Sequence, residues 1–153
     1  MKSKVLILFT IFTLFLTGCG SKTEQVLAFQ NELNAVILKM EASHNELENL
    51  DVSSADASEK ALDALANLQS AFEELANIDV KDDAYAFISD LAIEGSQYME
   101  QAYKLFDEAL TSERFDEETA SLAYQYLERA SKRINVIVTM LHGEVPEGVI
   151  VHE

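Results

Sequence analysis

The sequence contains few of the residues that form turns or crosslinks. Its 153 residues include one proline, five glycines, one cysteine and no tryptophan. Collagen-like, propeller-like and loop-rich scaffolds need many turn residues, so this composition excludes them. A single cysteine also excludes an intramolecular disulfide. A chain of this length forms one domain that buries about two thirds of its unfolded surface, and helices are the secondary structure that the composition favours.

Basic residues are also scarce. The chain carries 11 Lys and Arg against 27 Asp and Glu, a formal net charge of −16 at pH 7. Only Arg129, Lys132 and Arg133 form a basic cluster, and Glu128 lies beside them. Nucleic-acid binding needs a broad Lys and Arg footprint that neutralises phosphates, so the composition argues against it. The acidic balance instead favours cationic partners.

The N-terminal residues have the order of an export signal. Lys2 and Lys4 precede Val5–Leu16, a 12-residue apolar run that only two threonines interrupt. This length fits the hydrophobic region of a signal peptide, whereas a membrane-spanning helix needs about 18 or more apolar residues. Without these two lysines the chain keeps 9 basic and 27 acidic side chains, a net charge of −18.

The four residues Leu16-Thr17-Gly18-Cys19, which begin with the last residue of this run, resemble the lipobox of bacterial lipoproteins. The resemblance covers residues 1–19. It implies that Cys19 receives a diacylglyceryl group on its sulfur and becomes the first residue after cleavage. Two acyl chains would anchor the protein stably, where one chain gives only marginal binding. The alternative is an ordinary secretory signal cut near Gly18, which would leave Cys19 as a free thiol.

Hydrophobic spacing predicts four amphipathic helices. In the first, from residue 24 to about residue 50, apolar residues recur alternately three and four positions apart, at Val26, Phe29, Leu33, Val36 and Met40. The second helix is expected at 57–77, where Asp56 can cap it, and the third from about 82 to 110. The fourth is expected to begin after an N-cap at Asp116 and to stop at Gly143.

Four helices of similar length with short connections predict an all-α fold, an antiparallel up-down-up-down four-helix bundle behind the lipoprotein signal peptide. The expected organisation is a signal peptide at 1–18, a lipidated cysteine and tether at 19–23, the bundle at 24–143 and a tail at 144–153. The tail contains a short β-prone run. It either packs over the open end of the bundle or adds a strand to a partner sheet.

Metal-binding and catalytic patterns in the sequence are incomplete. Glu41 and His44 match half of the Glu-x-x-His pattern of di-iron bundles, but no second copy occurs. Met40 with His44, and Met140 with His142, would suit copper, but the two pairs belong at opposite ends of the expected bundle. No Gly-x-Ser-x-Gly turn or paired histidine marks a nucleophile. We therefore expect no enzyme activity, no metal and no cofactor.

One position on the third helix allows two interpretations. Gly95 lies within the helix, where glycine costs about 1 kcal/mol relative to alanine. Either it admits a large side chain from a facing helix, or it opens a small apolar pocket that Tyr98, Met99, Phe106 and Tyr124 line.

These features predict a lipoprotein on the extracytoplasmic face of a bacterial cell membrane, with a residue usage that favours a one-membrane cell. Its expected role is non-catalytic recognition or scaffolding of a basic envelope or secreted partner, through association that weakens with salt. The acidic residues expected on the outer faces are Glu46, Glu48, Asp63, Glu73, Glu74, Glu94, Glu100, Asp107, Glu108, Glu117 and Glu118. The alternative is a small-ligand or metal-carrying helical-bundle protein. The pattern fits a monomer and a helical dimer equally.

Overall fold

The computed structural model describes residues 24–80 and 85–141. Within these ranges the chain forms four helices and no strand, which confirms the predicted all-α class. The helices are α1 (Glu24–Glu48), α2 (Ala57–Ala76), α3 (Ala86–Thr111) and α4 (Glu117–Leu141). None of the helices in the described part is long and apolar enough to cross a membrane. The predictions for the signal peptide, Cys19, His142, Gly143 and the tail concern residues outside the described ranges.

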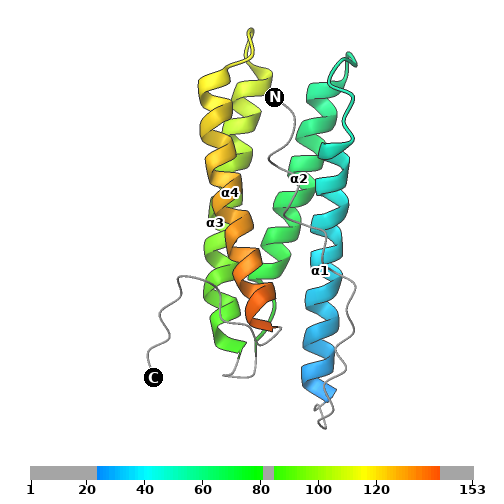
Figure 1. The fold of residues 1–153 in the computed structure, drawn as a ribbon, viewed down its shortest axis with the longest axis vertical. Helices are drawn as coiled ribbons and strands as arrows, with labels where there is room; N and C mark the ends of the chain where they lie inside the picture. The colour runs from blue at the N-terminus through cyan, green and yellow to red at the C-terminus, as the bar shows by residue number, and fades with distance from the viewer. Residues whose placement is uncertain (1–23, 81–84, 142–153) are drawn as a thin grey trace.

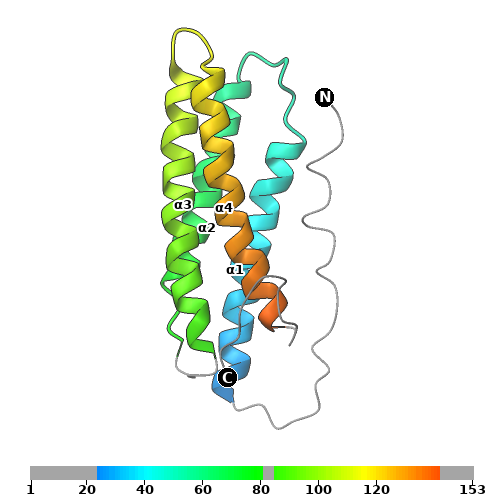
Figure 2. The same cartoon turned by 60° about the vertical axis from the view of Figure 1, so that its left-hand side comes forward.

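The four helices lie side by side as a bundle (Figures 1 and 2). Each helix packs against the one that follows it in the chain. In Figure 1, α1 rises from the lower end of the bundle, α2 descends, α3 rises and α4 descends. The loops at 49–56 and 112–116 therefore lie at the same end, which we call the loop end, and the start of α1 lies at the opposite end.

Small residues dominate the core of α3 and α4. Gly95, Ala102 and Ala109 recur every seven residues on α3 and are buried. Ala123 and Ala130, also seven apart and buried, continue this pattern on α4. The distance between two packed helices depends on the side chains at their contact. The glycine and alanines therefore explain why α3 and α4 pack closely.

Larger side chains fill the core between α1 and α4. Leu33, Ile37 and Met40 of α1 are buried in the same apolar cluster as Ile134 and Ile137 of α4. Within the described ranges, no Cα atom of α1 lies within 8 Å of a Cα atom of α4. The backbones of α1 and α4 therefore stay further apart than those of consecutive helices.

The structure tests two of the predicted helix caps. Asp116 caps α4 as expected, because its Oδ1 accepts hydrogen bonds from the backbone N–H groups of Glu118 and Thr119, both at 3.1 Å. These bonds lower the pKa of Asp116, and the bond from Thr119 has the largest effect. Asp56 stands before α2 but accepts no capping bond. Its carboxylate lies 2.8 Å from the ammonium of Lys60 instead, so the prediction of a side-chain cap there was wrong.

Candidate functional site

The residues of the predicted pocket lie at different levels of the bundle. Gly95 and Met99 are buried in the core. Phe106 meets Tyr124 edge to face, with 4.9 Å between the ring centroids, and Tyr124 is 63% exposed. Tyr98 is eight residues before Phe106, about 12 Å away along the helix axis, and packs against a different tyrosine of α4. The structure thus brings Phe106 and Tyr124 together and leaves Tyr98 apart from them.

Gly95 makes room for neighbours from two helices. A Cβ atom at this position would lie 3.3 Å from Cε1 of Phe72 on α2 and 3.4 Å from Cβ of Arg133 on α4. The first distance is tighter than ordinary van der Waals contact between carbon atoms, and the second lies at the lower limit of such contact. This geometry favours the packing explanation of the glycine, in which the missing side chain admits the ring of Phe72.

The structure places His44 and Met40, two of the residues considered as metal ligands, in contacts within the protein. Nε2 of His44 lies 3.3 Å from a carboxylate oxygen of Glu48 on the next turn of α1. Met40 is buried in the core. Across the two described ranges, no group of three or more His, Cys, Asp or Glu side chains is placed to hold a metal ion.

A polar cluster joins α3 to α4. Arg133 donates from Nε and Nη2 to the two carboxylate oxygens of Glu94, at 2.6 and 2.8 Å, and the hydroxyl of Tyr98 donates to Glu94 at 3.4 Å. The bonds from Arg133 hold the pKa of Glu94 below its ordinary value and raise the pKa of Arg133. The guanidinium of Arg129 lies 5.1 Å from the ring centroid of Tyr126. The two arginines of the predicted basic cluster therefore contact groups of their own chain.

Most of the other basic side chains are also paired. Of the seven Lys and Arg residues in the described ranges, five form ion pairs with carboxylates of the same chain. The pairs are Lys39–Glu74, Lys60–Asp56, Lys104–Glu100, Lys132–Glu128 and Arg133–Glu94. Three of the carboxylates expected to attract a partner, those of Glu74, Glu94 and Glu100, are thus engaged internally. Other acidic residues are exposed on the outer surface, at Glu46, Asp63, Glu73, Asp107, Glu108, Glu117 and Glu118.

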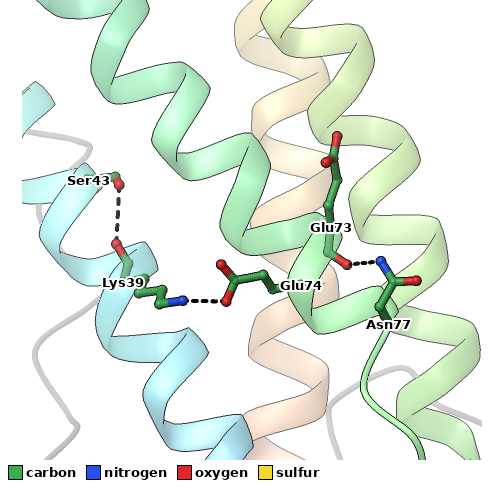
Figure 3. Close-up of polar contacts among 5 residues, drawn as sticks. All are labelled: Lys39, Ser43, Glu73, Glu74 and Asn77. Carbon is green, nitrogen blue, oxygen red and sulfur yellow. Dashed lines mark hydrogen bonds and ion pairs between the residues drawn. The ribbon is translucent and has the colours of Figure 1, made fainter.

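A groove of about 500 Å³ lies between α1 and α2. The residues that line it are Glu32, Ala35, Val36, Lys39, Ser70, Glu73, Glu74, Asn77 and Ile78. Val36 and Ile78 are buried, so they form an apolar floor. Lys39 reaches from α1 to the carboxylate of Glu74 on α2 and crosses the groove (Figure 3). The groove therefore combines an apolar floor with a charged rim.

Hydrogen bonds hold the rim of this groove. Ser43 Oγ donates to the backbone carbonyl of Lys39 at 3.2 Å. Asn77 Nδ2 donates to the backbone carbonyl of Glu73 at 2.8 Å, and Gln69 Nε2 donates to the Glu73 carboxylate at 3.0 Å. In Figure 3 the Glu73 side chain extends away from the ion pair of Lys39.

The sequence pattern does not indicate the groove. Ala35 and Ser70 are small rim residues on two different helices, and only the packing of α1 against α2 brings them together. One local signal was available, because Lys39 is the only basic residue of α1. Because an exposed ammonium can also remain solvated by water, this signal did not specify the pair with Glu74.

No protein-family model, curated protein or solved structure matches the chain. The chemistry of the surface is therefore the basis on which a function can be assigned.

Proposed function

We propose that this protein is a non-catalytic lipoprotein, anchored through Cys19 on the extracytoplasmic face of a bacterial membrane, that binds a basic protein or peptide. In this proposal residues 1–18 are a signal peptide. The mature domain is an antiparallel, up-down-up-down four-helix bundle, a topology that the short connections and the chain path in Figure 1 support.

The observation that carries the proposal is the internal pairing of the basic side chains. Because five of the seven described Lys and Arg residues already pair with carboxylates, little positive charge offsets the remaining acidic residues. A surface field of one sign raises the local concentration of oppositely charged molecules and speeds their association. The expected partner is therefore cationic.

The loop end carries the strongest excess of negative charge. Residues 46–63 and 104–118 contain 12 acidic and three basic side chains. Two of these three, Lys60 and Lys104, are paired with carboxylates. This end lies opposite the start of α1 (Figure 1). A lipid at Cys19 would stand only five residues before α1, so the loop end would point away from the membrane and meet a partner first.

The partner is identified by affinity capture. The full chain in nonionic detergent is immobilised, incubated with a solubilised envelope extract and eluted along a salt gradient, and the released proteins are identified by mass spectrometry. We expect a basic protein that leaves at moderate salt, since salt screens charges over a Debye length of about 8 Å at physiological ionic strength. Capture that is equally strong at low and high salt would refute the electrostatic mechanism.

A charge-neutralised variant is the matched control for the capture. Asp107→Asn combined with Glu108→Gln, Glu117→Gln and Glu118→Gln removes four exposed charges at the loop end and leaves the core residues unchanged. We expect this variant to lose most of the captured protein.

The anchor is tested separately by growing cells with a labelled fatty acid. The wild-type chain should take up the label and fractionate with membranes, whereas Cys19→Ser should do neither. Equal labelling of both chains would exclude Cys19 as the lipidation site.

A further inference from the structure

The groove between α1 and α2 combines acidic side chains with an apolar floor. Its floor consists of Val36 and Ile78, which are 4% and 7% exposed. Ala35 and Ser70 line it with small, exposed side chains, and the side chain of Lys39 crosses it to Glu74, so only a small part of the floor is open to solvent. A flat acidic face attracts cations without holding them in one place, whereas this groove can enclose the apolar part of a side chain.

The charge of the groove is negative. Glu32, Glu73 and Glu74 contribute carboxylates, and Lys39 is the only basic residue in the lining. The ammonium of Lys39 already lies against the Glu74 carboxylate across the groove (Figure 3). One alkylammonium group of the chain itself therefore shows that this rim accepts such a group.

We propose that the groove binds the side chain of one lysine of the basic partner, with its methylene stem on Ala35, Val36 and Ile78 and its ammonium at Glu32 and Glu74. This inference rests on the proposed function, to which it adds a second contact that lies nearer the start of α1 than the loop end does. Lysine side chains cover apolar surface with their stems and keep the charged head at the water boundary. The ammonium offers three rotatable donors, which suits carboxylates contributed by two helices.

Lys39 acts as an internal competitor in this arrangement. Its ammonium occupies Glu74, which the incoming lysine needs. Removing the charge of Lys39 should therefore strengthen binding by freeing that carboxylate. Lys104 provides the matched control, because it also pairs with a glutamate, Glu100, but lies on α3 outside the groove lining. Lys39→Gln and Lys104→Gln change the net charge equally, so only the first tests the groove.

The experiment uses the full chain in nonionic detergent and a fluorescently labelled peptide of alternating lysine and serine, with affinity measured by anisotropy at low and high salt. We expect Lys39→Gln to tighten binding about 2–5-fold, the range that an exposed ion pair spans, and Lys104→Gln to change it by less than about 1.5-fold. Glu32→Gln should weaken binding about 2–5-fold, and Glu117→Gln, which removes an equal charge at the loop end, should weaken it less. Circular dichroism confirms that each variant is folded.

A steric variant gives an independent measurement. Ala35→Phe places a ring in the groove, whereas Ala42→Phe places the same ring on another exposed position of α1 outside the lining. We expect at least a fivefold loss of affinity for the first variant only. If Lys39→Gln matches Lys104→Gln and the two phenylalanine variants bind alike, the groove inference is wrong.

The remaining outcomes separate the inference from the proposed function. If peptide binding depends on salt but its affinity is the same for the groove variants and the wild type, the groove inference is refuted and the proposed function stands. Wild-type protein that shows no salt-dependent binding would refute both. Competition with 1,5-diaminopentane tests whether the groove binds a free amine or the side chain of a partner's lysine. We expect displacement of the peptide only at millimolar concentrations, and displacement at micromolar concentrations would assign the groove to a free amine and overturn the choice of a partner lysine.

Discussion

Substitution of Gly95 by alanine separates helix propensity from packing. Glycine inside a helix costs about 1 kcal/mol relative to alanine, so Gly95→Ala at an unobstructed site would stabilise the protein by about that amount. At this site the new Cβ would stand 3.3 Å from the ring of Phe72 and 3.4 Å from Cβ of Arg133. Phe72 is 3% exposed, so its ring has little room to withdraw.

The two effects have similar size and opposite sign. Adding one carbon to a packed core forces shifts that cost about 1–3 kcal/mol, and the lower end applies because the overlap is a few tenths of an ångström. We therefore expect the free energy of unfolding of Gly95→Ala to differ from the wild-type value by less than about 0.5 kcal/mol. Gly95→Leu should be destabilised by about 3 kcal/mol or more, since its side chain has no space.

Urea denaturation of the full chain in nonionic detergent, followed by circular dichroism at 222 nm, measures these differences. Phe72→Leu supplies the second half of a double-mutant cycle. In the Phe72→Leu background the clash is removed, so Gly95→Ala should stabilise by the full amount of about 1 kcal/mol. If Gly95→Ala stabilises the wild-type background equally, the packing explanation of this glycine is refuted.

Four further predictions concern single polar groups. Arg133→Lys should lower the free energy of unfolding by about 0.5–1 kcal/mol, because an ammonium cannot reproduce the two parallel bonds to Glu94; urea denaturation measures this loss. The folded pKa of Glu94 lies below its ordinary value of 4.5, so its stabilisation is present above that pH and is lost as the pH falls through the lowered pKa. Glu94→Gln should therefore lose less stability than the wild type between about pH 5 and pH 3. Asp116→Ala should lower the thermal midpoint by removing the α4 cap, and an unchanged midpoint would contradict the role of its two bonds. Ser43→Ala should raise stability by about 0.5 kcal/mol, since this buried hydroxyl bonds only within its own helix.

The helical fold could be predicted because its signal is local. Apolar residues spaced three and four apart specify one face of a helix, and the structure buries that face, as Leu33, Val36 and Met40 show on α1. The cap at Asp116 was predictable for the same reason, since its partners are two and three residues away. The second helix was expected at 57–77 and is observed at Ala57–Ala76.

Features that depend on two chain segments, or on competing local partners, could not be predicted. The glycine at position 95 allowed two explanations, and only the positions of Phe72 and Arg133 on other helices favour packing. Asp56 had a capping position and a lysine four residues later, and sequence gives no ranking between the two partners. The groove likewise needs the register of α1 against α2.

The distribution of small residues connects the packing of the bundle with its candidate site. Inside the bundle, glycine and alanine allow α3 and α4 to pack closely, and the side chain of Arg133 then reaches across to Glu94. At the surface between α1 and α2, Ala35 and Ser70 are equally small but exposed, so they leave a hollow above Val36. The same residue types therefore bring helices together in the core and open a groove at the surface. Because Ala35 is exposed and lies on α1, variants at this position can change binding while the packing of α3 against α4 stays intact.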